Sequence, residues 1–312
     1  MSNSSRDYTI GVSAVLFSSV VWGTTGTAAT FAPEVSAVAI GAAAMGIGGL
    51  LQALLAGRGI VRSLSLLKKQ LGLLVLGGFA VAVYPLAFYA SMRMAGVTIG
   101  TVVTIGSAPL LSALIEYFFD RAQLSRQWLI GALIGLAGIV LITVAEGREH
   151  ASIETNGSVI TGICLGLLGG LTYALYSWTA RRMMLNGVRS SVAMGATFGF
   201  GGLLLMPVLI AAGSPFLTSW NNAAVGIYMA IVPMFLGYVC FGIGLARIPA
   251  SMATTITLIE PVVAAILAII IVGERLPLMG WFGVVLVISC LVVITISLNR
   301  PLRQDQKAVV GT

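Results

Sequence analysis

Apolar runs long enough to cross a lipid bilayer fill most of the chain. A hydrocarbon core of about 30 Å requires roughly 20 apolar residues per helix. The runs cover residues 8–30, 35–56, 70–93, 97–119, 127–145, 158–180, 191–212, 223–245, 250–272 and 279–298. Their length is typical of helices, since β-barrel strands would give shorter segments of alternating polarity. The pattern predicts an all-α polytopic membrane protein with ten transmembrane helices and no soluble domain.

The composition supports burial in lipid. Hydrophobic residues make up 58% of the 312 residues and charged residues 9%, with a mean hydropathy of +1.03. Soluble domains carry about 25% charged residues. The composition therefore excludes a soluble enzyme and a nucleic-acid-binding protein, although the net charge is +7. Cys164, Cys240 and Cys290 lie in apolar runs and the single histidine, His150, in a polar gap, so we expect no catalytic centre, metal site or cofactor.

The basic residues predict an orientation. Cytoplasmic loops of membrane proteins carry an excess of Lys and Arg. If the N-terminus is cytoplasmic, 14 basic residues lie inside and 3 outside. The inside set is Arg6, Arg58, Arg62, Lys68, Lys69, Arg121, Arg126, Arg181, Arg182, Arg189, Arg247, Arg300, Arg303 and Lys307, and the outside set is Arg93, Arg148 and Arg275. We therefore expect both termini to be cytoplasmic.

The two halves of the chain repeat each other. A shift of 152 residues places Pro109 on Pro261 and residues 140–143 on residues 292–295. Each half contains five apolar runs, and an odd number means that the second half enters the membrane from the opposite side. Inverted repeats of this kind place a binding site near the bilayer midplane, between halves that rock against each other.

The repeat divides the chain into two units of one integrated membrane domain. Residues 1–150 form the first five-helix repeat, and residues 151–312 form the second with a short cytoplasmic C-terminal tail.

Several short motifs carry a family resemblance. They are Trp22-Gly23, Tyr173-Ala174-Leu175-Tyr176, Glu260-Pro261, and Gly273-Glu274-Arg275-Leu276 followed by Trp281. With these motifs the chain resembles, over residues 8–298, the EamA-type ten-helix members of the drug/metabolite transporter superfamily. Within that superfamily it looks most like the YddG-type aromatic amino acid exporters. The first half departs from the pattern, because Ala108 stands where Glu260 does.

The resemblance implies a secondary transporter of the bacterial inner membrane that exports small organic solutes. It does not specify the solute.

Glu260 is the deepest acidic residue, near the centre of the ninth run. An ionised acid at this depth costs about 3 kcal/mol on insertion scales. One interpretation is a proton site or an anchor for a solute amine. The other is a protonated acid that binds a carbonyl freed by Pro261, such as that of Thr257. Glu116 lies nearer a membrane surface, and we expect it to be solvated or paired there.

Four prolines lie inside the third, fourth, eighth and ninth apolar runs. Proline in a helix removes one hydrogen bond and kinks the helix. Their places in the third, fourth, eighth and ninth runs predict kinked helices around a cavity, although prolines are common in membrane helices. They are Pro85, Pro109, Pro233 and Pro261.

Aromatic residues three or four positions apart share helix faces on three runs. Such faces suit a flat amphipathic solute, through stacking and single hydrogen bonds. They would equally serve helix packing or face lipid. The candidates for solute binding are Tyr84 with Phe88, Tyr173 with Tyr176, Tyr238 with Phe241, and Trp22.

Hydroxyl residues precede two of the prolines. They could contact a solute or bond back to their own helix. They are Thr101, Thr104 and Ser107 in the fourth run and Thr254 and Thr257 in the ninth.

Taken together, these residues predict export of small amphipathic solutes, such as aromatic or other apolar amino acids, by alternating access. The first, third, fourth, sixth, eighth and ninth runs would surround the cavity. The expected partners are the solute and membrane lipid, with proton coupling as an option and the oligomeric state open. The alternatives are a membrane-embedded enzyme or lipid-handling protein, which would need clustered catalytic groups, and a channel, which would need a continuous polar lining.

Overall fold

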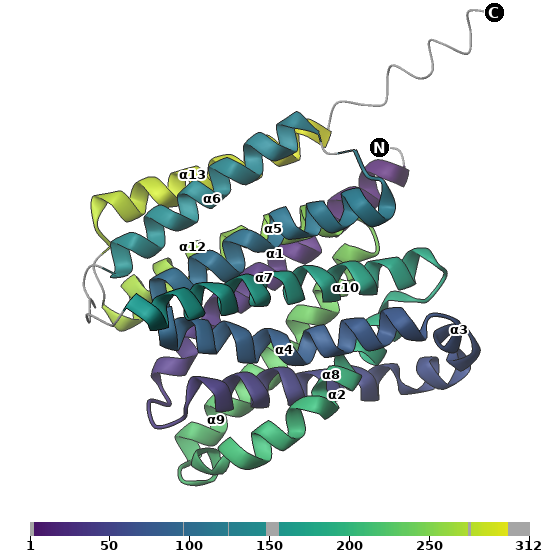
Figure 1. Cartoon of the computed structure of the whole chain (residues 1–312), viewed down its shortest axis with the longest axis horizontal. Coiled ribbons are helices and arrows are strands. Elements are labelled where there is room, and N and C mark those ends of the chain that lie inside the picture. Colours follow the sequence, from purple (N-terminus) through teal and green to yellow (C-terminus); the bar gives the residue numbers. More distant parts are fainter. Residues whose placement is uncertain (1–2, 96, 124, 148–155, 274–275, 299–312) are drawn as a thin grey trace, which may run out of the picture.

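The structure is a computed structural model that describes residues 3–95, 97–123, 125–147, 156–273 and 276–298 (Figure 1). Every regular element in these ranges is helical, which confirms the all-α prediction. The α-helices of the first half are α1 (Asn3–Thr30), α2 (Ala37–Arg62), α3 (Leu64–Lys69), α4 (Leu71–Ala95), α5 (Val97–Asp120) and α6 (Arg126–Gly147).

The second half has more breaks within its runs. Its α-helices are α7 (Asn156–Leu185), α8 (Ser190–Ala212), α9 (Trp220–Met229), α10 (Tyr238–Leu245), α11 (Ala250–Ile256), α12 (Glu260–Leu267) and α13 (Leu278–Leu298). Between them lie the 3₁₀-helices η1 (Ser214–Leu217) and η3 (Thr257–Ile259) and the π-helices η2 (Ala230–Gly237) and η4 (Ala268–Val272).

Eight helical segments are long and apolar enough to cross a membrane. The fifth and tenth runs are represented by shorter apolar stretches, Arg126–Ile142 in α6 and Leu278–Val293 in α13. The structure therefore supports an integral membrane protein.

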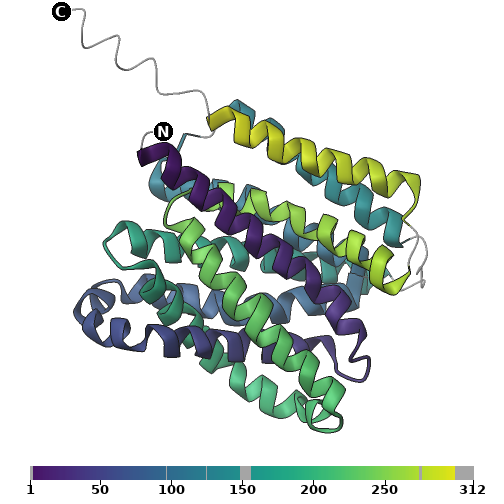
Figure 2. The same ribbon diagram turned by 180° about the vertical axis from the view of Figure 1, so that it is seen from behind.

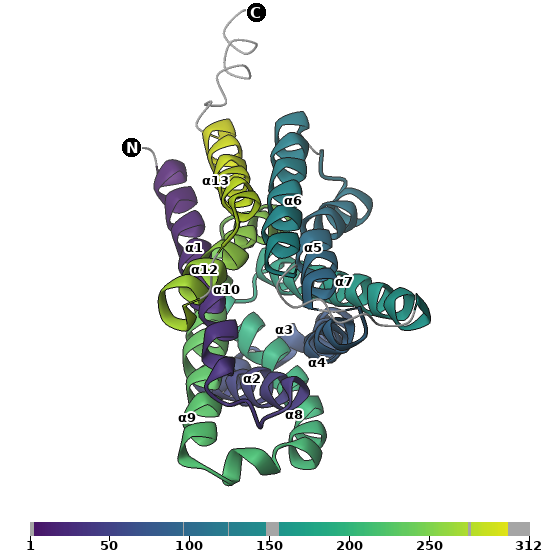
Figure 3. The same ribbon diagram turned by 90° about the vertical axis from the view of Figure 1, so that its left-hand side faces the viewer.

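The packing partners of the two halves correspond. Helix α1 packs against η2 and α10 of the eighth run and against η3 and α12 of the ninth. Helix α7, its counterpart in the second half, packs against α4 and α5 of the third and fourth runs. Helices α2 and α8 pair with each other, as do α6 and α13, which form one edge of the bundle (Figures 1 and 3). Each of these contacts made by a helix of the first half therefore has a counterpart made by the matching helix of the second half.

One end of the bundle carries most of the basic residues. Helix α1 begins and α13 ends at this end, and α3, with Lys68 and Lys69, also lies there (Figures 1 and 2). We refer to it as the basic end. Helix α7 begins at the other end (Figure 1), so the first helices of the two halves run in opposite directions. The repeat boundary at 150/151, His150 and the basic residues Arg148, Arg275, Arg300, Arg303 and Lys307 lie outside the described residues.

The four prolines differ in their effect on the helix. Pro85 and Pro109 lie within the α-helices α4 and α5. Pro233 lies in the π-helix η2, and Pro261 begins α12 directly after the 3₁₀ turn η3. A change in helix type therefore accompanies Pro233 and Pro261, whereas Pro85 and Pro109 lie within continuous α-helices.

Glycine allows the closest helix contacts. A Cβ atom on Gly195 of α8 would lie 2.8 Å from the carbonyl oxygen of Gln52 of α2, and one on Gly199 would lie 2.5 Å from the Cβ of Ala53. Small residues at such spacing let two backbones approach closely. Close packing is important in a membrane, because the hydrophobic effect does not drive helices together there.

Candidate functional site

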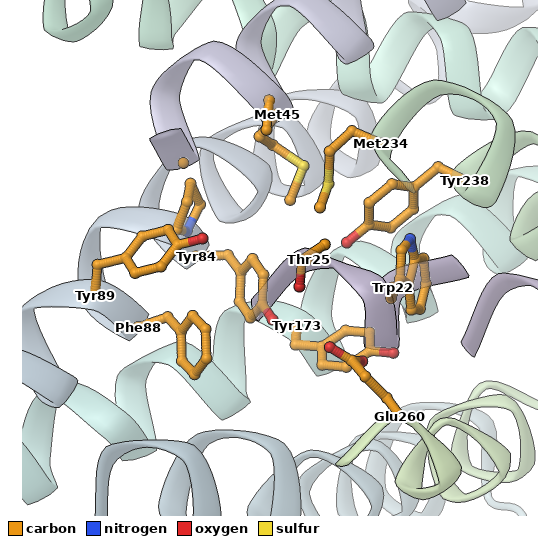
Figure 4. A pocket seen from close by; sticks show the side chains of 13 residues that line it. Trp22, Thr25, Met45, Tyr84, Phe88, Tyr89, Tyr173, Met234, Tyr238 and Glu260 are labelled. Atoms are coloured by element: carbon orange, nitrogen blue, oxygen red, sulfur yellow. The ribbon is translucent and has the colours of Figure 1, made fainter. Parts of the chain in front are cut away.

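A small central cavity lies where α1, α2, α4, α7, η2, α10 and α12 meet (Figure 4). Its volume is about 50 Å³, which is enough to hold water. The predicted cavity is thus present but narrow. Its lining is Trp22, Thr25, Gly41, Ala44, Met45, Tyr84, Pro85, Phe88, Tyr89, Tyr173, Met234, Tyr238 and Glu260.

The structure brings the predicted aromatic residues together around this cavity. The ring centroids of Trp22 and Tyr238 are 4.6 Å apart, and those of Tyr84 and Tyr173 are 5.5 Å apart. The rings of Tyr84 and Phe88 are stacked, with centroids 5.9 Å apart. Rings from both halves of the chain therefore form one wall, at centroid separations typical of aromatic pairs.

A second aromatic layer lies next to the cavity. Tyr176, Phe198 and Phe241 are fully buried. The hydroxyl groups of Tyr176 and Tyr238 are 2.8 Å apart and share a hydrogen bond. Tyr176 follows the cavity residue Tyr173 by one turn towards the end of α7, so this layer separates the central cavity from the basic end.

Side chains of the first half satisfy carbonyl groups of the π-helix η2. The indole nitrogen of Trp22 donates to the carbonyl oxygen of Pro233 at 2.8 Å, and Ser18 Oγ donates to that of Gly237 at 2.8 Å. Gln52 Nε2 donates to the carbonyl oxygen of Met234 at 3.3 Å. Irregular backbone at membrane depth requires such partners, and π-helical segments often occur at functional sites.

Glycine makes room for Trp22. A Cβ atom on Gly237 would lie 2.6 Å from the indole nitrogen of Trp22. Gly23, next to Trp22, brings α1 against α12, because its Cβ would lie 2.9 Å from the carbonyl oxygen of Glu260. The Trp22-Gly23 motif therefore fixes the position of the indole ring relative to the eighth and ninth runs, in which the helix type changes.

The Glu260 side chain lines the cavity among these rings (Figure 4). Its backbone N–H donates to the carbonyl oxygen of Thr257, so the carbonyl freed by Pro261 already has a donor. Within the described residues, the Glu260 carboxyl group makes neither a hydrogen bond nor an ion pair. This arrangement favours a carboxyl group available to a ligand over one that repairs the helix break.

The predicted hydroxyl residues lie away from the cavity lining. The glycine face of α7 covers α5, where Cβ atoms on Gly169 and Gly170 would lie 2.8 Å from Thr104 Cγ2 and 2.1 Å from Ser107 Oγ. Thr101 of α5 is likewise absent from the lining. The expectation that the fourth run contributes to the lining is therefore not supported by its packing.

The two threonines of the ninth run bond to backbone. Thr254 donates to the carbonyl oxygens of Ala250 and Ser251, and Thr257 donates to that of Thr254. Thr257 also accepts a 3.0 Å hydrogen bond from the hydroxyl group of Tyr173. Thr257 can therefore position a ring of the cavity wall without touching the solute.

The sequence analysis did not anticipate that α2, and further residues of α1, α4 and η2, contribute to the lining of the central cavity. Met45 and Met234 lie opposite the rings, and Thr25 and Tyr89 complete the lining (Figure 4). A Cβ atom on Gly41 would lie 2.3 Å from Tyr89 Cε2. The run of small residues 41–44 was the available signal that a bulky side chain packs there.

Glu116 is not the solvated interfacial residue that one interpretation predicted. It is 4% exposed. Its carboxylate accepts hydrogen bonds from the backbone N–H groups of Ala250 and Ser251 and from the Ser251 hydroxyl group. The two N–H groups are the first of α11, which lack partners within the helix and favour a negative charge. Glu116 therefore anchors α5 to the start of the ninth run.

Groups of three or more His, Cys, Asp or Glu side chains that could hold a metal ion do not occur in the described part of the chain.

Known proteins resemble this chain in sequence. The sequence model of the EamA-like transporter family matches residues 9–144 and 160–296, one match in each half. The uncharacterized transporter YwfM of Bacillus subtilis (strain 168) is 28% identical, covering 90% of this chain and 92% of its own. The uncharacterized inner membrane transporter YicL of Salmonella typhimurium (strain LT2) is 23% identical, covering 94% and 97%.

A relative with a named solute matches over a shorter length. The threonine/homoserine exporter RhtA of Salmonella typhimurium (strain SL1344) is 24% identical, covering 62% of this chain and 64% of its own. A protein of known crystal structure, 20% identical, superposes with a TM-score of 0.72 over 95% of this chain and 98% of its own. The last comparison shows a shared fold.

Proposed function

We propose that this chain, which belongs to the EamA-like transporter family, exports amphipathic amino acids or related small solutes by alternating access through the central cavity. The chain is an integral protein of the bacterial inner membrane. Its relatives are named as transporters, and several of them as amino acid exporters. Amino acids with aromatic or other apolar side chains fit best, because rings form the cavity wall.

The Glu260 carboxyl group carries this proposal. It lies in a ring-lined cavity without a protein partner among the described residues. An acid at membrane depth is expensive and marks a solute or proton pathway. Here it can bind a solute ammonium group, while the surrounding rings contact the apolar part of the solute. If a proton replaces the ammonium group when the solute leaves, export is coupled to proton entry.

The remaining lining disfavours solutes with strong negative charge. Lys and Arg do not occur among the described residues that line the central cavity. Sugar phosphates and nucleotides would need such residues at depth.

The small volume of the cavity supports a carrier rather than a channel. Binding sites for small molecules typically measure about 300–1,000 Å³, far more than the roughly 50 Å³ of the central cavity. The rings must therefore part to admit a solute. The buried layer of Tyr176, Phe198 and Phe241 also interrupts the continuous path that a channel would need.

The proposed movement follows from the predicted topology of ten transmembrane helices in two inverted repeats, residues 1–150 and 151–312. Two observations support it: the corresponding packing of the two halves, and the opposite directions of α1 and α7 (Figure 1). Rocking of one half against the other would open the cavity first to one side of the membrane and then to the other. The excess of basic residues supports the basic end, where α1 begins and α13 ends, as the cytoplasmic side.

Efflux from cells that overproduce the protein tests this function. Cells loaded with labelled amino acids, amines or drugs should release apolar or aromatic amino acids faster than cells with the Glu260→Ala variant. Tyr84→Ala should change the order of preferred solutes, whereas Tyr117→Ala, at an exposed ring outside the cavity, should leave it unchanged. Equal release of every solute by the wild type and Glu260→Ala would refute the proposal.

A further inference from the structure

A second and larger cavity lies at the basic end. Its volume is about 610 Å³, which is the size of a small-molecule site. It lies between α5, α7 and α11, and the rings of Tyr8 and Trp128 contribute to its wall. We refer to it as the vestibule. The charged and hydroxyl side chains of its lining include Glu116, Asp120, Arg181, Arg182 and Ser251.

The vestibule is distinct from the central cavity. On α7, Arg181 lines the vestibule and Tyr173 lines the central cavity, and at 1.5 Å per residue these positions are about 12 Å apart along the helix. Tyr176, which is fully buried, lies between them. The vestibule therefore lies nearer the basic end than the ring-lined cavity does.

Both carboxylates of the vestibule already have partners. Asp120 pairs with Arg182 at 2.7 Å and also accepts a 2.7 Å hydrogen bond from the indole nitrogen of Trp178. Glu116 accepts the N–H groups at the start of α11 and the Ser251 hydroxyl group. These two acids are therefore committed to holding α5, α7 and α11 together.

Arg181 is different, because it makes no direct ion pair among the described residues, although Glu116 and Asp120 lie near enough to act on its charge. Its Nη1 atom donates to the carbonyl oxygens of Leu245 and Ile248, at the end of α10. A guanidinium group carries five N–H donors in a planar fork. The N–H groups of Nε and Nη2 make no hydrogen bond within the described residues, so they remain for a ligand in the vestibule.

A carboxylate is the ligand that this arrangement fits best. The planar fork of arginine matches the two oxygens of a carboxylate. The four charged side chains of the vestibule sum to zero, so a zwitterion meets neither net repulsion nor net attraction. The rings of Tyr8 and Trp128 offer an apolar surface to the rest of such a molecule.

We infer that the vestibule is a loading site in which Arg181 binds the carboxylate of a zwitterionic amino acid before the solute reaches Glu260. This inference rests on the proposed function. The two ends of the amino acid are then recognised at different depths, the carboxylate at the basic end and the ammonium group in the central cavity. An amine without a carboxylate does not use the first site.

Transport of matched solutes into inside-out membrane vesicles tests the loading site. The probes are phenylalanine and phenethylamine, which differ by the carboxyl group. Loss of a charge-assisted hydrogen bond of about 1.5–3 kcal/mol corresponds to a rise of about 10- to 100-fold in KM. We expect Arg181→Gln to raise the KM for phenylalanine at least tenfold and to leave that for phenethylamine within about twofold. Arg189→Gln, at an exposed arginine of the same end, is the matched control.

The outcomes separate the loading site from a structural role. If Arg181→Gln reduces transport of both probes equally, Arg181 only holds the end of α10, and the inference is overturned. If that variant does not fold, Arg181→Lys retains the charge without the fork and should raise the KM for phenylalanine alone. Equal effects of Arg181→Lys on both probes would likewise overturn the inference. Failure of the wild type to transport either probe would instead refute the proposed function, and this inference with it.

Discussion

The indole nitrogen of Trp22 in α1 lies 2.8 Å from the carbonyl oxygen of Pro233 in η2, and it donates a hydrogen bond to it. The two residues belong to opposite halves of the chain. Since Pro233 lies in the π-helix, the bond stabilises irregular backbone at the same point where the ring forms the cavity wall. The bond therefore joins the two halves at the wall of the central cavity.

Trp22→Phe should destabilise the protein. The variant keeps an aromatic ring but leaves the Pro233 carbonyl group without its donor, at a cost of about 1–3 kcal/mol for a buried group. We expect a lower melting temperature in detergent and slower transport. Trp220→Phe is the control, because Trp220 is 82% exposed. Equal melting temperatures for Trp22→Phe and Trp220→Phe would show that the hydrogen bond does not stabilise the protein.

Gly237→Ala should displace the Trp22 ring. The added Cβ would lie 2.6 Å from the indole nitrogen, and overpacking of this kind costs about 1–3 kcal/mol. Tryptophan fluorescence and transport rate should both change. Gly57→Ala is the matched control, because its Cβ would meet no atom within 4 Å. Wild-type transport by Gly237→Ala would mean that the position of Trp22 is not critical.

Glu260→Gln should remove the response of transport to pH. Glutamine keeps the shape of the side chain but can neither release a proton nor pair with an ammonium group. Acidification of the external side should accelerate export by the wild type, because protons there replace the solute on Glu260. Proteoliposomes with an imposed pH gradient provide the measurement, with Glu34→Gln, at an exposed acid, as control. A Glu260→Gln variant that still responds to pH would exclude Glu260 as the proton site.

Single cysteines should report the orientation. In a background without the native cysteines, Leu217→Cys tests the end opposite the basic end, where residue 217 is 90% exposed. Asn186→Cys tests the basic end, in the exposed turn after α7. A membrane-impermeant thiol reagent should label Leu217→Cys in intact cells and Asn186→Cys only after permeabilisation. The reverse pattern would refute the predicted topology.

Much of the central cavity could be predicted from the sequence. Tyr84 and Phe88 stand at helical spacing on one apolar run, and Trp22, Tyr173 and Tyr238 stand on three others. The structure places all five around one cavity. Residues that share a helix face need only the helical period to be grouped correctly. Their contact with a solute remains a prediction.

Other features depend on packing between distant segments. Thr104 and Ser107 were candidates either for solute contact or for hydrogen bonds to their own helix. The glycines of α7 cover them, and a glycine in a sequence does not show which helix it faces. Glu116 looked interfacial, because a single sequence does not show that the start of α11 lies against it. Met45 of α2 was not among the candidates, because its neighbours across the cavity come from other helices.

Counterflow in proteoliposomes tests the central claim most directly, namely that the two halves alternate around a shared binding cavity. Vesicles loaded with unlabelled amino acid should take up external labelled amino acid faster than empty vesicles, and the rate should saturate with concentration. A carrier behaves in this way because the loaded protein returns across the membrane faster than the empty one. Uptake that rises linearly with concentration and ignores the internal solute would contradict alternating access.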